Sequence, residues 1–189
     1  MICCFKGKFK VTSPRGIRID PITKKENVTH KGIDLVGIDD INVYAIADGV
    51  IAATPYESNG FGYYVRQLLP DGRRIYYAHL KQNSITVKPN QSIKKGQKLG
   101  VMGKTGRSTG AHTHLEIRPA GTSGESLDIS AFTGIPNKVG TYTYIKKIDP
   151  IEAACNIEDK CGFEKQTMEY LWKYKYANDL MVKLWKAME

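Results

Sequence analysis

The sequence lacks the segments that would place it in a membrane or mark it for secretion. No apolar run approaches the roughly 18 residues that a membrane-spanning helix needs. Near the start, the only apolar patch is Ile-Cys-Cys-Phe, which is shorter than the apolar region of a secretory signal peptide. We therefore expect no transmembrane helix and no leader. On this view the protein either starts in the cytoplasm or has already been freed of its leader.

Cysteine is scarce, and its spacing excludes two common uses. The four cysteines, Cys3, Cys4, Cys155 and Cys161, lack the C-x-x-C spacing that is typical of zinc knuckles and redox motifs. Adjacent cysteines rarely bridge each other, so we expect no bond between the first two. The last two either close a small loop or remain free thiols, as expected for a chain without a leader.

Acidic residues are outnumbered by basic ones. The chain has 28 Lys and Arg against 19 Asp and Glu, which gives a formal net charge of +9. A basic protein is attracted to polyanions such as nucleic acid, anionic lipid or a bacterial wall carrying teichoic acid, although such a charge also serves solubility alone. The basic residues are spread along the chain, without an arginine-rich tract or the aromatic and basic signature of a nucleic-acid module. We therefore expect no nucleic-acid partner.

The first part of the chain, residues 1–150, carries the pattern of a β-protein. Residues 9–30 are rich in turn formers and predict a loop segment. Alternating and apolar stretches then predict strands at residues 42–47, 50–54, 62–69, 73–80 and 112–118. The closely spaced glycines between residues 96 and 110 resemble the turns of barrel-sandwich folds. We therefore predict a mainly β domain, built as a barrel-sandwich-like antiparallel structure.

The second part, residues 151–189, is predicted to be a helical C-terminal extension. From Phe163 onwards there is no glycine or proline, and apolar residues recur at steps of three and four. This spacing predicts one amphipathic helix. Its apolar stripe should pack on the β-domain, on a second copy or on a partner protein. Binding to a membrane is the weaker alternative, because Glu164, Glu169 and Asp179 interrupt the lysines.

Histidine is rare as well, yet all four copies lie in short motifs that suit one metal site. His30 precedes Asp34 in HKGID, His79 ends IYYAH, and the HTH of GAHTHLE holds His112 and His114. Residues two apart on a strand point to the same side, so the last two histidines should face one cavity. Each motif alone has a simpler explanation, as a surface or a packed histidine. Together they favour a divalent metal, above all zinc, which imidazole and carboxylate donors suit.

The donors alone leave the coordination of this metal open. If His30, Asp34, His112 and His114 all bind, the site has four protein ligands and is closed, as in structural zinc sites. If three of them bind, one position is left for water, as catalysis requires.

Three segments, HKGID, YYAHL and GKTGRSTGAHTHLEIR, together resemble the lysostaphin-type zinc endopeptidases, which cut peptide bonds in bacterial peptidoglycan. SPRGIRIDPITKK and VYAIADGVI are similar to that family's entry segment and first hairpin, so the resemblance runs from Val11 to Arg118. The sequence departs from the family in two places. The Gly-Thr-Pro that is common before the hairpin is missing after Asp34, and Asp20 stands where a histidine is frequent. Neither departure falls on a ligand or catalytic position.

The resemblance implies one zinc ion per chain, bound by His30, Asp34 and His114. It implies that the remaining histidines, His79 and His112, serve catalysis. The activity implied is metal-assisted hydrolysis of a peptide bond in the stem or cross-bridge of peptidoglycan, which is then the partner of the protein.

Two alternatives accompany this interpretation. The same fold serves non-catalytic wall-binding or regulatory modules, and a structural zinc site would suit a protein whose helix mediates assembly. Degenerate relatives lose ligands, whereas all five positions are present here, so the enzyme is favoured. Glu116 either orients a histidine or forms an exposed ion pair. A wall-cutting enzyme without a leader is expected to be a released phage or prophage lysin, a virion-borne enzyme, or a secreted enzyme already trimmed.

Overall fold

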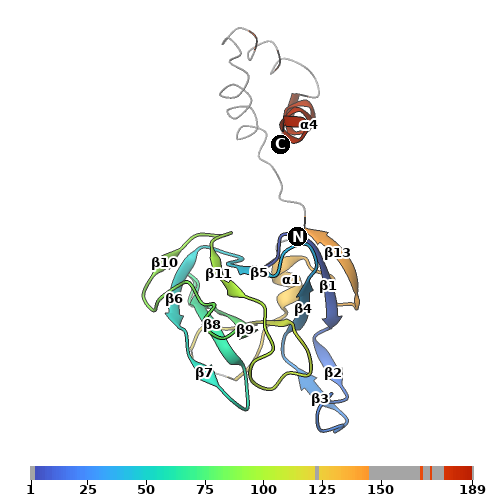
Figure 1. The fold of residues 1–189 in the computed structure, drawn as a ribbon, viewed down its shortest axis with the longest axis vertical. Helices are drawn as coiled ribbons and strands as arrows, with labels where there is room; N and C mark the ends of the chain where they lie inside the picture. Colours follow the sequence, from blue (N-terminus) through green and yellow to red (C-terminus); the bar gives the residue numbers. More distant parts are fainter. Residues whose placement is uncertain (1–2, 122–123, 145–166, 168–170, 172–176, 189) are drawn as a thin grey trace. The chain divides into compact units, whose positions relative to one another are not determined.

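The computed structural model describes residues 3–121, 124–144, 167, 171 and 177–188. The chain divides into two units, Met1–Ile145 and Lys146–Glu189, which are described separately. The first unit is mainly antiparallel β-structure, which confirms the predicted class (Figure 1). The predicted domain boundary at Pro150 lies outside the described residues and stays a prediction.

Short strands are the main regular elements of the first unit. They are β1 (Gly7–Ser13), β2 (Gly16–Arg18), β3 (Val28–His30), β4 (Ile33–Gly37), β5 (Asn42–Tyr44), β6 (Gly49–Ala53), β7 (Tyr56–Glu57), β8 (Gly62–Leu68), β9 (Arg74–Leu80), β10 (Ser92–Ile93), β11 (Lys98–Val101), β12 (Thr113–Arg118) and β13 (Gly140–Tyr144). One short helix, α1 (Ile129–Thr133), begins after Asp128, whose side chain accepts hydrogen bonds from two backbone N–H groups of its first turn.

The strands form one large open sheet and two small ones. The large sheet follows the order β10-β6-β8-β9-β12-β4-β1-β13, with β7 beside β8, and the small sheets are β11-β5 and β2-β3. Within the described residues, no pairing joins β10 to β13, so the predicted barrel-like closure is wrong. Closure requires a continuous ladder between the two edges, and β10, with its two residues, offers few backbone groups for one.

The prediction of a loop segment over residues 9–30 is correct for residues 14–15 and 19–27 but misses three strands. Phe9 and Val11 are fully buried and alternate with the exposed residues Lys8 and Lys10, which is the pattern of a strand with one face in the core. This strand, β1, pairs with β4 on one side and β13 on the other. The hairpin of β2 and β3 follows it. In contrast, the strands predicted at 62–69 and 73–80 are confirmed to within one residue.

The main core lies on one face of the large sheet, and the other face carries polar side chains beside a small buried cluster of Tyr64, Tyr76 and Ala78. Leu115 and Ile117 of β12 are fully buried in the core. Since strand residues alternate between faces, His114 and Glu116 point to the opposite side. In the ladder, His114 lies opposite Asp34 of β4. The fold thus places two of the predicted site residues next to each other on adjacent strands.

In the second unit the structure describes one helix, α4 (Ala177–Met188), in which Met181 is buried and Asp179 pairs with Lys183 at 2.6 Å. The predicted helix from Phe163 onwards lies mostly outside the described residues, as do the two C-terminal cysteines. No helix in the described part of the chain is both long and apolar enough to span a bilayer. Near the N-terminus, Cys3 and Cys4 are both buried and free.

Candidate metal centre

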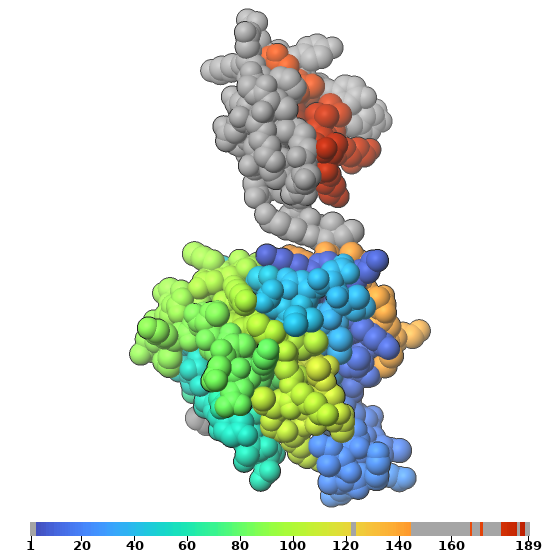
Figure 2. Space-filling view, viewed as in Figure 1, coloured from blue at the N-terminus to red at the C-terminus, as the bar shows by residue number. Residues whose placement is uncertain are grey.

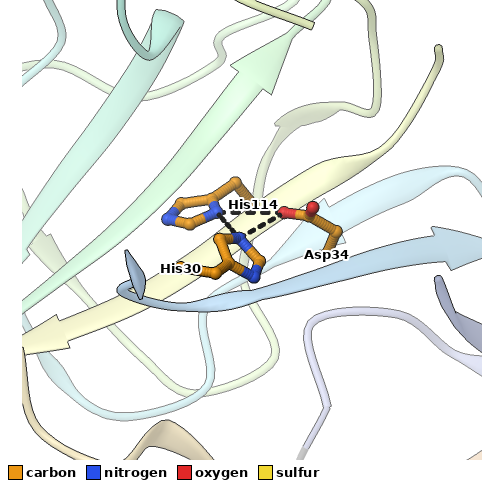
Figure 3. A group of neighbouring side chains, drawn as sticks. All are labelled: His30, Asp34 and His114. Carbon is orange, nitrogen blue, oxygen red and sulfur yellow. Dashed lines mark hydrogen bonds and ion pairs between the residues drawn. The ribbon is translucent and has the colours of Figure 1, made fainter. Parts of the chain in front are cut away.

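Three of the predicted residues converge on one point (Figure 3). His30 ends β3, Asp34 lies on β4 and His114 lies on β12, and all three are buried. Nε2 of His30 lies 3.1 Å from Oδ1 of Asp34 and 3.0 Å from Nδ1 of His114. Nδ1 of His114 lies 3.0 Å from the same carboxylate oxygen. Three donor atoms therefore form a nearly equilateral triangle.

The outer nitrogen of each of these two histidines is fixed by an oxygen. Nδ1 of His30 lies 2.8 Å from the carbonyl oxygen of Pro14, and Nε2 of His114 lies 3.1 Å from a carboxylate oxygen of Glu116. These oxygens accept hydrogen bonds, so the outer nitrogens carry the hydrogens. The inner nitrogens then turn lone pairs toward each other and toward Asp34. Such an arrangement is repulsive unless a proton or a cation lies between the donors.

The donor set fits zinc. Two imidazole nitrogens and one carboxylate oxygen are typical ligands of that ion, in a tetrahedral arrangement at about 2.0–2.1 Å. This arrangement separates neighbouring ligand atoms by about 3.3–3.4 Å, close to the triangle of 3.0–3.1 Å in the structure. Among the described residues, His30, Asp34 and His114 are the group whose ligand atoms all approach one another in this way.

The electrostatics of the triangle follow from its hydrogen bonds. Burial alone would raise the pKa of Asp34, but its close polar contacts with His114 and His30 hold it well below its ordinary value. Burial alone would lower the pKa of His114, but its bonds to Asp34 and Glu116 raise it to about 9. The proton that His114 retains occupies the place of a cation between nitrogen and carboxylate. A metal ion would replace this proton.

A second pair of histidines lies beside the triangle. The rings of His79 and His112 are 4.7 Å apart, and Nε2 of His112 lies 3.6 Å from Oδ1 of Asp34. Nδ1 of His79 donates to the carbonyl of Thr105 at 2.8 Å, and Nδ1 of His112 donates to that of Gly110 at 2.8 Å. Both rings therefore carry a lone pair on Nε2. The structure brings all five predicted residues to the same cavity, of about 320 Å³.

His79 has an unusual backbone. Its φ of +61° lies in the left-handed region, which residues other than glycine rarely adopt and which is often found at functional sites. Its N–H donates to the carbonyl of Phe61 at 2.8 Å, where the pairing of β8 and β9 shifts register. Burial lowers the pKa of the side chain to about 4, so the ring is neutral at neutral pH. Nothing in the IYYAH motif indicated this conformation.

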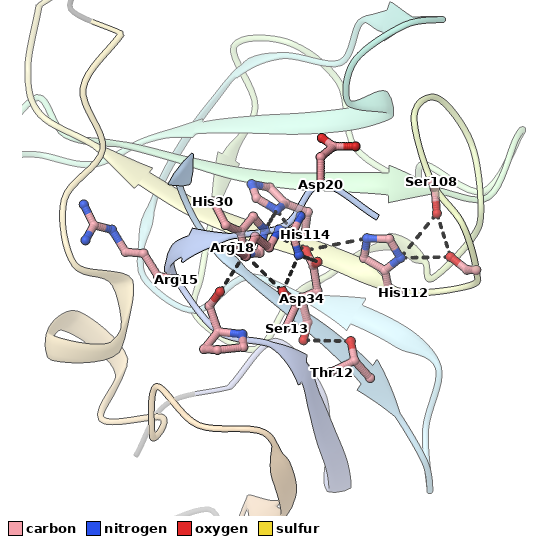
Figure 4. Close-up of polar contacts among 12 residues, drawn as sticks. Thr12, Ser13, Arg15, Arg18, Asp20, His30, Asp34, Ser108, His112 and His114 are labelled. Atoms are coloured by element: carbon pink, nitrogen blue, oxygen red, sulfur yellow. Dashed lines mark hydrogen bonds and ion pairs between the residues drawn. The ribbon is translucent and has the colours of Figure 1, made fainter. Parts of the chain in front are cut away.

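Arg18 is a site residue that the sequence analysis missed (Figure 4). It lies on β2, and its Nη1 donates to Oδ2 of Asp34 at 3.2 Å and also to the hydroxyl of Ser13. The arginine thereby occupies one carboxylate oxygen and leaves the other, Oδ1, to the histidines. The sequence gave no signal for it, because alternation on a strand would place the apolar Ile17 in the core and Arg18 in solvent, whereas Ile17 is exposed and Arg18 points toward Asp34.

Glu116 orients a histidine, one of the two alternatives that the sequence left open. Its side chain is almost fully buried and accepts from Nε2 of His114 on one oxygen. Its other oxygen accepts from Nε of Arg118 at 2.6 Å. Burial alone would raise the pKa of Glu116, but these two hydrogen bonds lower it. A charged carboxylate thus fixes the tautomer of His114.

Comparison with known proteins identifies the family to which the chain belongs. The family model described as Peptidase family M23 matches residues 28–128, more than half of the chain. The chain belongs to peptidase family M23. The match contains all five predicted residues, and it confirms the lysostaphin-type resemblance. M23 peptidases are zinc metallopeptidases.

Individual M23 relatives agree with this assignment. The peptidoglycan DD-endopeptidase ShyA of Vibrio cholerae is 32% identical over 140 residues, which cover 70% of this chain and 30% of ShyA. The chain thus spans less than a third of that relative. The catalytic domain of lysostaphin, an antimicrobial peptidase from Staphylococcus simulans, is 27% identical with a TM-score of 0.59, covering 67% of this chain and 92% of that domain. A zinc-containing peptidase from Vibrio cholerae is 27% identical with a TM-score of 0.55, and the match covers 67% of this chain and 38% of that one.

Proposed function

We propose that the chain is a zinc-dependent endopeptidase that hydrolyses peptide bonds in bacterial peptidoglycan, in the stem peptide or in the cross-bridge. Membership of M23 and a relative named as a peptidoglycan DD-endopeptidase support the substrate class. The observation that carries the proposal is the convergence of two inward imidazole nitrogens and one carboxylate oxygen beside a second histidine pair. A cation site next to groups that handle protons suits hydrolysis.

We assign one zinc ion per chain to His30, Asp34 and His114. His112 stays outside the set because, among the described residues, the group whose ligand atoms all lie close to one another consists of His30, Asp34 and His114. This choice of three ligands leaves one position open, as in catalytic zinc sites. A zinc ion held there supplies a Lewis acid that polarises the scissile carbonyl and acidifies the attacking water.

We assign proton transfer to His79 and His112. Each ring has Nδ1–H donated to a backbone carbonyl, so Nε2 is the nitrogen that exchanges protons with the substrate. His79 is neutral at neutral pH and is ready to accept a proton. One of the pair would take the proton of the water, and one would stabilise the oxyanion or protonate the leaving amine.

The place of action and the role of the C-terminal residues are also proposals. The wall-directed name of the relative supports action in the cell wall, as a released phage or prophage lysin, a virion-associated enzyme or a secreted one. Residues 151–189 are proposed to mediate docking or oligomerisation, as the amphipathic spacing of their sequence suggests.

Digestion of purified peptidoglycan tests the proposed function. Zinc-loaded protein should release new amino termini from defined wall types, and mass spectrometry of the fragments should identify the bond that is cut. A chelator should stop the reaction, and zinc should restore it. If the zinc-loaded chain binds every wall type but cuts none, the endopeptidase is wrong. The alternative, a non-catalytic wall-binding or regulatory module, would then take its place.

A further inference from the structure

The cavity has two walls that come from distant parts of the sequence. One wall is the hairpin of β2 and β3 with its connecting turn, residues 19–27. The other is the loop of residues 103–112, which ends at His112. Figure 2 shows the surfaces of these two segments, blue and yellow-green, next to each other. Within the described part of the chain, Asp20 and Arg107 make the only hydrogen bonds and ion pair between the two walls.

Asp20 is built into its wall as a fixed acceptor. Its residue is 5% exposed, and its Oδ1 accepts from the backbone N–H groups of Ile22 at 2.9 Å and Thr23 at 2.8 Å. These bonds close the turn around the carboxylate. Nη2 of Arg107 donates to both carboxylate oxygens, at 2.8 and 2.7 Å. The backbone N–H of Thr23 and the guanidinium of Arg107 hold the pKa of Asp20 well below its ordinary value, so the carboxylate is charged whenever the protein is folded at neutral pH.

Arg107 is the last residue of the other wall before His112 whose backbone is hydrogen-bonded to another part of the protein. Its backbone N–H donates to the carbonyl of Gly60 at 2.9 Å, and Gly106 packs so closely that an added Cβ would lie 2.5 Å from the same oxygen. Beyond Arg107, residues 108–111 make hydrogen bonds among themselves, to Gly106 and to His112. We call residues 108–111 the outer segment. The side chain of Arg107, through its hydrogen bonds to Asp20, is the contact with the opposite wall that lies next to this segment in the sequence.

The outer segment fixes the ring of His112. The carbonyl of Gly110 accepts from Nδ1 of His112 at 2.8 Å and from the hydroxyl of Ser108 at 2.6 Å, and that hydroxyl lies 3.3 Å from the same Nδ1. If the outer segment moves, Nδ1–H loses its acceptor, and the ring is no longer held with its Nε2 lone pair toward the cavity. The backbone of His112 is held separately, by the carbonyl of Gly103 at 3.0 Å.

From these contacts we infer that Asp20 and Arg107 are a pair of positioning residues, which hold the His112 loop against the hairpin that ends in His30. The inference rests on the proposed function, because it assigns the pair an effect on catalysis by His112. The pair connects the loop that carries His112, a proposed proton-transfer residue, to the hairpin that carries His30, a proposed zinc ligand. Its loss should leave substrate binding largely intact but misplace a catalytic ring.

Steady-state kinetics of the zinc-loaded full chain test the inference, on a soluble cross-linked muropeptide dimer that the wild type cleaves. Arg107→Ala, a change at a side chain that is 42% exposed, should lower kcat about tenfold to a hundredfold. KM, zinc content and the unfolding midpoint should change little. Arg107→Lys should recover part of the loss, because a single nitrogen makes both contacts to Asp20. Asp20→Asn should lower kcat in the wild type but not further in Arg107→Ala, since the two residues act as one pair.

A matched control is the pair of Asp71 and Arg73, in which an aspartate likewise accepts from an arginine side chain and a backbone N–H. Arg73→Ala and Asp71→Asn should leave kcat unchanged. An unchanged kcat in Arg107→Ala, a rise in KM alone, or independent effects of the two single changes would overturn the inference. Failure of the wild type to cleave any dimer would instead count against the proposed function.

Tautomer measurement by ¹⁵N NMR of the histidine rings provides a readout that a loss of stability would not move. In the wild type, His112 should be protonated at Nδ1 and unprotonated at Nε2. In Arg107→Ala, the two tautomers should mix. A ring that keeps the wild-type tautomer in this variant would show that the outer segment does not depend on the pair.

Discussion

The three proposed zinc ligands stand on paired strands, whereas the two proposed catalytic histidines depend on less regular backbone. On the metal side, His114 lies opposite Asp34 in the ladder of β12 and β4, and the buried residues beneath fix that register. On the proton-transfer side, His79 has a left-handed backbone and His112 is oriented by a loop. The metal side is therefore specified by the core of the fold. The other side is specified by individual hydrogen bonds.

This difference teaches where each function is vulnerable. A one-residue slip of β12 would turn its histidine and glutamate into the core, so register and metal site are maintained together. Loop contacts have no such support from the core, and losing one should change a ring's orientation while the sheet stays intact. Substitutions on the two sides should accordingly separate metal binding from catalysis.

The largest effect is expected on the metal side. His114→Ala removes one of three ligands and leaves the carboxylate of Asp34 without its strongest partner, so zinc content should fall from about one ion per chain to near zero. Wall-lytic activity should disappear with the metal. Elemental analysis of the purified variant, together with release of soluble wall fragments, measures both. His112→Ala is the matched control, because it removes the neighbouring imidazole of the same motif and should retain zinc. If both variants lose the metal equally, His112 is a fourth ligand and the site is closed.

The next effect concerns the proton-transfer side. His79→Ala and His112→Ala should each lower kcat about a hundredfold to ten-thousandfold, the usual contribution of a general acid or base. Circular dichroism and zinc content should match the wild type, because neither residue belongs to the triangle of ligands. Near-normal lysis by both variants would remove these histidines from the mechanism.

A smaller effect is expected in the pH dependence of stability. The pKa of His79 falls from 6.5 to about 4 on folding, because burial disfavours the charged ring. Between these values the unfolded chain binds more protons, so the stability that His79 contributes decreases as the pH falls from 6.5 through 4. The gap corresponds to about 3 kcal/mol. Metal-free wild type should therefore lose about 3 kcal/mol more than His79→Gln over this range. Urea unfolding at a series of pH values measures the difference, and parallel curves would contradict the neutral, buried state of His79.

The site could be predicted from the sequence because its residues lie in short motifs. The two-residue spacing of His112 and His114 already placed them at one cavity, and the family resemblance separated the ligands from the remaining histidines. Strand pairing completes the site, since it brings Asp34 opposite His114, 80 residues away in the sequence. Local pattern and tertiary structure agree here.

The parts that were missed depend on contacts between distant segments. Arg18 and Asp34 are 16 residues apart, and Asp20 and Arg107 are 87 apart, with no local motif linking either pair. The left-handed backbone of His79 follows from a register shift between two strands, which a single strand's pattern does not contain. The strands within residues 9–30 were missed for a related reason, because short strands surrounded by turn formers are stabilised by their neighbours in the sheet.

The smallest of the predicted effects concerns Glu116, which accepts hydrogen bonds from the zinc ligand His114 and from Arg118. Glu116→Gln keeps the size of the side chain but replaces one oxygen by an NH₂ group, which must face either His114 or Arg118. Both of these are donors, so one of the two hydrogen bonds is lost and the tautomer of His114 is less firmly held. Zinc affinity should fall about tenfold to a hundredfold, as for other partners of metal-bound histidines. Competition with a zinc chelator measures the change.

Glu57→Gln is the matched control for this prediction, since Glu57 also accepts a side-chain hydrogen bond, from the hydroxyl of Tyr64 at 2.7 Å, but contacts neither the triangle nor the second histidine pair. Its zinc affinity should equal that of the wild type. Equal affinity in Glu116→Gln would show that strand register alone positions His114, without help from the carboxylate. A loss in Glu116→Gln alone would show that even the side of the site built on paired strands depends on one hydrogen bond to fix its tautomer.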